Sequence, residues 1–137
     1  MTTKEIQIGN WLTDGPKGFP MFVQAIYGDD TVYLDFEENE GDTWETDIKD
    51  ICPIPITKEL LLNSGFTNKS APDIYTYKEK VNGWMIDLFQ MDDGNHVLKF
   101  FKGGNKPLKI YHYTVTYIHE LQNAVRLITK QDLKIEI

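Results

Sequence analysis

The stretch YIHELQN contains the residues that most resemble a catalytic motif, His119 followed by Glu120. A zinc-peptidase helix needs histidines at positions i and i+4, because side chains one turn apart reach the same metal, and a glutamate at i+1 as general base. Position i+4 here is Asn123, a poor zinc ligand, and His96 and His112 lie on predicted strands. The pattern therefore indicates an amphipathic helix, without a metal site or a catalytic residue.

One face of this helix carries His119, Asn123 and Arg126 at positions i, i+4 and i+7. A histidine, an amide and a guanidinium on one stripe could recognise a carboxylate, a phosphate or a peptide end. The other interpretation is a polar helix face that only meets solvent. Both interpretations stay open, and we count the three residues as candidate binding residues.

A second candidate is the acidic stretch between Asp29 and Asp50. It holds ten acidic residues and one base, so it carries a net charge of −9, whereas the whole chain carries −7. Such a surface repels phosphate backbones and suits a basic partner. The candidate binding residues in this stretch are Tyr33, Asp35, Glu37, Glu38, Glu40, Asp42 and Glu45.

The acidic stretch does not match a calcium-binding loop. Such a loop needs glycine at its sixth position and an acid at its twelfth. Counted from Asp35, these positions hold Glu40 and Thr46. We therefore expect no metal and no cofactor.

A basic run is formed by Lys99, Lys102, Lys106 and Lys109. In contrast to the acidic stretch, it could form a patch that binds nucleic acid.

The first half of the chain reads as short strands separated by turn residues, over residues 6–12, 21–27, 31–36 and 43–48. This spacing predicts a small antiparallel, SH3-like β-barrel in residues 1–56. We expect Trp11, Tyr27 and Trp44 to fill its core, because a barrel this small has little else to fill it. Tyr33 alternates out of phase with Val32 and Leu34 and is expected to point outward.

The second half, residues 57–137, reads as a short helix, a four-stranded antiparallel meander and a C-terminal helix, so the fold class is α+β. Thr57 can cap the helix at residues 58–64, and Gly65 is placed to end it in a left-handed conformation. The predicted strands are 74–81, 84–91, 96–102 and 108–113. Residues 116–130 have helical spacing, and DLKIEI alternates like a last strand. Whether the two halves form one continuous domain stays open.

The composition of the chain indicates where in the cell the protein is located. The chain has 137 residues, and its one cysteine, Cys52, cannot form an internal disulfide, which suits a reducing cytoplasm. No apolar run reaches the roughly 18 residues that span a bilayer. The N-terminal stretch MTTKEIQIGNW has no secretory h-region. We therefore expect a cytoplasmic protein that does not bind a membrane.

Three stretches, IQIGNWL, DICPIPITKELLLNSGF and YIHELQNAVRLITKQDLKI, carry a family resemblance. They are similar to the patterns IGNWV, PIPLTEEILLKLGF and VHELQNLYFALTGKEL of a protein family, without an assigned function, from gut Bacteroides-type bacteria and their phages and mobile elements. The resemblance implies a phage or prophage context and a cytoplasmic location. It supplies no catalytic residue. Near the end, Ala124-Val125-Arg126 and Ile128-Thr129-Lys130 depart from the family pattern.

The sequence thus favours a non-enzymatic interaction protein that binds a protein partner through its acidic surface. A basic partner suits that surface, and a counter-defence role through nucleic-acid mimicry is one version of it. The alternative is a small-barrel protein that binds nucleic acid or a nucleotide. A third reading, a small hydrolase centred on His119 or the acids, requires a pocket that joins His119 to a carboxylate. The oligomeric state stays open.

Overall fold

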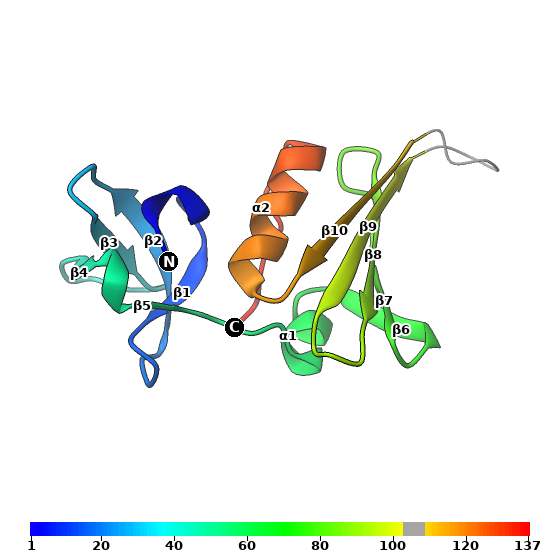
Figure 1. The fold of residues 1–137 in the computed structure, drawn as a ribbon, viewed down its shortest axis with the longest axis horizontal. Helices are drawn as coiled ribbons and strands as arrows, with labels where there is room; N and C mark the ends of the chain where they lie inside the picture. The colour runs from blue at the N-terminus through cyan, green and yellow to red at the C-terminus, as the bar shows by residue number, and fades with distance from the viewer. Residues whose placement is uncertain (103–108) are drawn as a thin grey trace. The chain divides into compact units, whose positions relative to one another are not determined.

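The protein forms two compact units, described by a computed structural model that covers residues 1–102 and 109–137. The first unit comprises Met1–Pro55 and Tyr117–His119, and the second comprises Ile56–Thr116 and Glu120–Ile137. Each unit is built on one antiparallel sheet (Figure 1). The expected α+β class, with antiparallel sheets and a C-terminal helix, is confirmed.

The first unit contains five strands and two short 3-10 helices. The helices are η1 (Thr3–Glu5) and η2 (Ile48–Asp50), and the strands are β1 (Trp11–Asp14), β2 (Pro20–Ile26), β3 (Thr31–Asp35), β4 (Trp44–Asp47) and β5 (Ile51–Pro53). The strand order is β4-β3-β2-β1-β5, with all neighbours antiparallel. The first four strands therefore form a meander, and β5 returns to the free side of β1.

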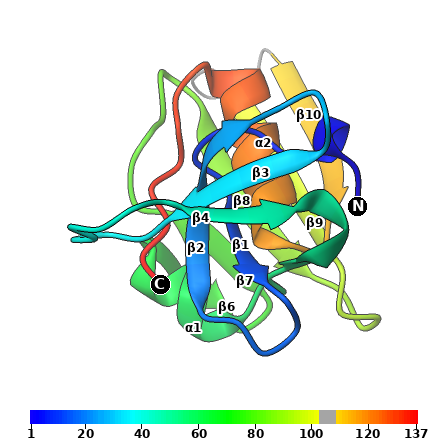
Figure 2. The ribbon, with the colours of Figure 1, turned by 90° about the vertical axis from the view of Figure 1, so that its left-hand side faces the viewer.

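The prediction of a closed, SH3-like barrel is wrong, because this sheet is open, with β4 and β5 as its two edge strands. The sheet is nevertheless strongly curved. A register shift between Val23 and Ala25 interrupts the β2–β3 ladder, and such a bulge bends the strand and increases its twist. Figure 2 shows β3 and β4 running crosswise to the first part of β2. Curvature without closure leaves an opening at the β4 side of the sheet.

Apolar side chains from alternating strand positions fill the concave face of the first sheet. Leu12, Met21, Val23, Val32 and Leu34 are all buried. In β3 the buried Val32 and Leu34 flank the half-buried Tyr33, as the alternation predicted. The same alternation does not bury the other aromatics, because Tyr27 is 54% exposed and Trp44 is 57% exposed. The expectation that these two rings fill the core is wrong.

The second unit contains two α-helices and a five-stranded meander. Its elements are α1 (Lys58–Asn63), β6 (Phe66–Ala71), β7 (Ile74–Tyr77), β8 (Met85–Gln90), β9 (His96–Lys102), β10 (Lys109–Val115) and α2 (Ile118–Thr129), whose first two residues belong to the first unit. The strands lie in chain order. The prediction of four strands missed β6, because its sequence FTNKSA has few apolar residues and follows directly on the helix cap.

Helix α2 packs along one face of the second sheet (Figure 1). Leu121 and Val125 of the predicted apolar stripe are fully buried, and alternating residues of β7, β8 and β9 are buried as well: Tyr75, Ile86, Leu88, Leu98 and Phe100. The last residues do not form the expected strand. Instead Leu133 and Ile135 bury their side chains from an irregular segment. Within residues 1–102 and 109–137, no helix has the length and apolarity to cross a membrane.

Helix α1 begins at the predicted residue, Lys58, and ends at Asn63, one residue before the predicted end. The Thr57 hydroxyl accepts a hydrogen bond from the Leu60 backbone N–H at 3.2 Å. Gly65 follows the C-cap residue with a φ of +95°, and a Cβ atom there would lie 3.2 Å from the side chains of Tyr77 and Lys78. Only glycine adopts this backbone conformation without strain.

We expect Gly65→Ala to lower the free energy of unfolding by about 1–2 kcal/mol, because the left-handed backbone penalises a Cβ atom. Urea unfolding followed by circular dichroism measures this change. Gly28→Ala is the control, since a Cβ there meets no atom within 4 Å. Equal midpoints for the two variants would contradict this account of the helix end.

Burial of His96 predicts a pH-dependent stability. His96 is 5% exposed, and this burial lowers its pKa below the ordinary value of 6.5. The unfolded chain therefore takes up a proton before the folded chain does, so stability is lost as pH falls below about 6.5. We expect the drop in urea midpoint between pH 7 and pH 5 to be smaller in His96→Gln than in the wild type. The exposed His112→Gln is the control and should keep the wild-type slope; equal slopes for all three proteins would overturn the assignment.

Candidate functional site

A side-chain bridge joins the end of β1 to β4 in the first unit. The Asp14 carboxylate accepts a hydrogen bond from the Trp44 indole Nε1–H and a second one, at 2.9 Å, from the Thr46 hydroxyl. In the sheet order, β2 and β3 lie between these two strands. The curved sheet is therefore held across its concave side by one carboxylate, where a closed barrel would use backbone hydrogen bonds.

The strand alternation explains why these side chains meet. Trp44 lies directly opposite Leu34, and Thr46 lies opposite Val32. Residues that pair in this way share a face of the sheet, so both side chains lie on the face that carries the buried core. Asp14 lies two residues after the buried Leu12 and shares that face too. Three polar or amphipathic side chains thus meet at the rim of the core.

Beside this bridge lies a pocket of about 270 Å³. Its floor is Met21 and Leu34, which are 3% and 0% exposed. Three aromatic rings line it while remaining exposed to solvent: Phe19 at 60%, Phe36 at 39% and Trp44 at 57%. The rings of Phe19 and Phe36 meet edge to face, with centroids 5.6 Å apart. Large exposed apolar side chains gathered at a hollow are typical of binding sites.

Two loops form the walls of the pocket. In the first, Gly18 approaches β1 so closely that a Cβ atom would lie 2.4 Å from the Asp14 backbone oxygen. In the second, Asn39 donates from its side-chain amide to an Asp35 carboxylate oxygen at 2.7 Å and to the Asp42 backbone oxygen at 3.2 Å. It also accepts from the Gly41 N–H at 3.0 Å. These contacts fix the loop that carries Phe36 and Asp42 into the lining.

The unit that holds the pocket has a strongly negative net charge. Residues 1–55 contain twelve acids and three lysines, a net charge of −9, and the rest of the chain carries +2. In the described parts of the chain, no salt bridge reaches an acid between Asp29 and Asp50. Asp42 lines the pocket and is exposed. A cationic group that enters the pocket therefore meets carboxylates that form no salt bridge with a described residue.

The structure distributes the predicted acidic residues over three places. Asp42 lines the pocket, and Asp35 supports the loop through Asn39. The remaining loop acids, Glu37, Glu38 and Glu40, are exposed around it.

Tyr33 and Glu45 lie opposite each other on β3 and β4, out of phase with Leu34 and Trp44, and therefore on the other face of the sheet. There the charge of Glu45 raises the pKa of the Tyr33 hydroxyl. The Tyr33 ring also contacts Tyr27 edge to face, with centroids 5.4 Å apart. These two predicted residues do not belong to the pocket.

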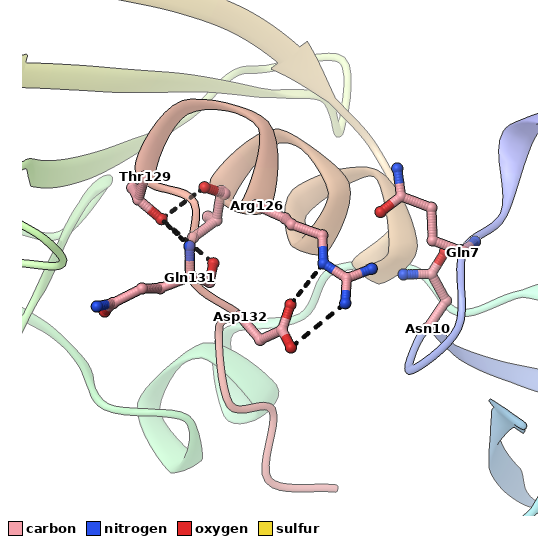
Figure 3. A network of polar contacts seen from close by, with 7 residues as sticks. Gln7, Asn10, Arg126, Thr129, Gln131 and Asp132 are labelled. Atoms are coloured by element: carbon pink, nitrogen blue, oxygen red, sulfur yellow. Dashed lines mark hydrogen bonds and ion pairs between the residues drawn. The ribbon is translucent and has the colours of Figure 1, made fainter.

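The predicted polar face of α2 is not a simple solvated stripe. His119 is 5% exposed, and its ring stacks on Tyr117 with centroids 6.0 Å apart. Asn123 is half-buried. The Arg126 side chain is engaged, because its Nε lies 2.8 Å from an Asp132 carboxylate oxygen (Figure 3). His119 is thus removed from the surface, whereas Arg126 stays exposed in its ion pair, and a binding role for this face stays a prediction.

The predicted basic run does not form one patch in the part that the structure describes. Lys99 and Lys102 lie an odd number of residues apart on β9, so they project from opposite faces of the sheet. Their ammonium groups lie over the rings of Phe89 and Trp84, at 5.8 and 5.4 Å from the centroids. Lys106 and the side chain of Lys109 lie outside the described residues.

The sequence reasoning missed most of the pocket. Trp44 was assigned to the core, and neither Asp14 nor Phe19 was singled out. A usable signal was present, because Phe19 directly precedes β2 and Phe36 directly follows β3, so both are apolar residues at strand ends. Among the described residues, no group of three histidine, cysteine or acidic side chains is placed to hold a metal ion.

Comparison of the chain with protein-family models, with curated proteins and with solved structures gave no match. The resemblance to phage and mobile-element proteins therefore stays a prediction.

The bridge at Asp14 can be tested directly. We expect Asp14→Ala to lower the free energy of unfolding of the first unit by about 1–2 kcal/mol, since two donors lose their acceptor at a partly exposed site. Loss of the hydrogen bond to Asp14 should also shift the Trp44 indole N–H resonance. This resonance is identified by its absence from the spectrum of Trp44→Phe. The control is Asp42→Ala, whose carboxylate accepts no hydrogen bond from the described residues. If Asp14→Ala unfolds at the wild-type urea concentration, the bridge does not hold the sheet.

Proposed function

We propose that this protein is a non-enzymatic interaction protein that binds a basic segment of a protein partner at the pocket of its first unit. The observation that supports this most is the combination of three exposed aromatic rings at the pocket with a net charge of −9 on residues 1–55. Aromatic residues are enriched where proteins bind one another, and complementary charge steers a partner to the site.

A binding role fits the polar groups of the pocket better than catalysis does. Asp14 is engaged by Trp44 and Thr46, and Asn39 is engaged by its own loop. The hydrogen bonds of these groups therefore stabilise the walls of the pocket. The carboxylate of Asp42 is left to meet a ligand, whereas general acid–base chemistry commonly uses two groups with different proton affinities.

The aromatic rings also favour peptide binding over a mimic of nucleic acid. A mimic needs regularly exposed negative charge, and an apolar hollow adds nothing to that role. The phage or mobile-element origin, the cytoplasmic location and a counter-defence role remain parts of the proposal that come from the sequence resemblance. The alternative, binding of nucleic acid through the basic run, has less support, since Lys99 and Lys102 project from opposite faces of their sheet.

Selection from a random peptide library on the immobilised protein tests this function. We expect the wild type to enrich basic peptides. A variant with Glu37→Gln, Glu38→Gln, Glu40→Gln and Asp42→Asn should enrich them at least tenfold less. The same selection at 0.5 M salt should weaken the enrichment, because exposed charges are screened.

The matched control removes four exposed acids from the second unit, through Glu59→Gln, Asp73→Asn, Glu79→Gln and Asp92→Asn. It changes the net charge by the same amount and should keep the wild-type enrichment. An equal loss of enrichment in both variants would show that net charge alone attracts the peptides. Enrichment of no peptide, or of acidic ones, would reject the function.

A further inference from the structure

We infer that the occupant of the pocket is a single arginine side chain of the partner, with its guanidinium against the aromatic rings and its charge turned toward Asp42. This inference rests on the proposed function and deepens it. It concerns the pocket of about 270 Å³ between the β1–β2 and β3–β4 loops, whose lining lies wholly within the first unit.

The lining calls for a group that is both flat and cationic. The floor of Met21 and Leu34 offers no polar atom of a side chain, so it suits the methylene part of a long side chain. Above the floor stand the rings of Phe19, Phe36 and Trp44, whose faces attract a cation. A purely apolar side chain would contact the rings and the floor but would gain no electrostatic attraction from the negative charge of the unit.

Arginine fits this combination better than lysine. The guanidinium is planar, stacks on aromatic faces and is more weakly hydrated than an ammonium group. It also donates in a fork that matches a carboxylate, and Asp42 supplies one at the edge of the pocket. The Asp14 carboxylate is directed to Trp44 and Thr46. It therefore orients the indole ring, and Asp42 is the group left to pair with the guanidinium.

The test uses four blocked tripeptides, acetyl-Gly-Xaa-Gly-amide, in which Xaa is arginine, lysine, citrulline or norleucine. Citrulline has nearly the shape of arginine without its charge, and norleucine retains the methylene chain alone. Each peptide is titrated into the ¹⁵N-labelled full-length protein, and the Trp44 indole N–H resonance is followed. We expect the arginine peptide to bind at least fivefold tighter than the lysine peptide and at least tenfold tighter than the two neutral peptides.

Three variants locate the binding. Phe19→Ala and Asp42→Asn should each weaken the arginine peptide at least fivefold. Tyr27→Ala should leave it unchanged, because Tyr27 is an equally exposed aromatic residue of the same unit that does not line the pocket. Phe19 is 60% exposed, so its truncation should leave the fold intact, and the dispersion of the amide spectrum verifies this for every variant.

The outcomes separate this inference from the proposed function. Equal binding of citrulline or norleucine would show that the pocket accepts an apolar group, and tighter binding of lysine would reject the guanidinium. Arginine binding that moves resonances outside the pocket would place the site elsewhere. If basic peptides are selected through the loop acids while the arginine peptide leaves Trp44 unchanged, the proposed function stands and the arginine pocket is rejected.

Discussion

The architecture of the first unit depends on one carboxylate. Asp14 ends β1, and by accepting hydrogen bonds from Trp44 and Thr46 it fixes the far strand of a sheet whose backbone ladder does not close. A closed barrel would bury its inner rings and leave no hollow at that edge. In this protein the side-chain link leaves the rim of the core accessible, and the indole that it orients becomes a wall of the pocket. The site is thus a direct result of incomplete closure.

Local features of the fold were predictable because each depends on a few neighbouring residues. Thr57 and Gly65 mark the ends of α1 through hydrogen bonding and backbone conformation. The alternation around Tyr33 and the helical spacing of Leu121 and Val125 correctly predict which side chains are buried. Strand β6 was missed because its polar sequence gives no apolar alternation, and its place in the sheet comes from pairing with β7.

The candidate site was less predictable, for a related reason. Charge can be counted along the chain, so the acidic stretch was evident, but a hollow requires residues that are distant in sequence. Asp14 and Trp44 are separated by thirty positions, and their meeting depends on the curvature of strands between them. Alternation correctly placed Trp44 on the core-facing side. It could not show that the strand lies at an open edge, where facing the core still leaves a ring exposed.

The open edge has a further consequence for how the chain behaves in concentrated solution. Strand β4 is the last strand of its sheet, so one side of its backbone is available to pair with a strand of another molecule. It is short, and Glu45 and Asp47 alternate along it. Their like charges oppose edge-to-edge growth between copies of the protein. The acids of this strand thereby act as gatekeepers against fibrillar self-assembly.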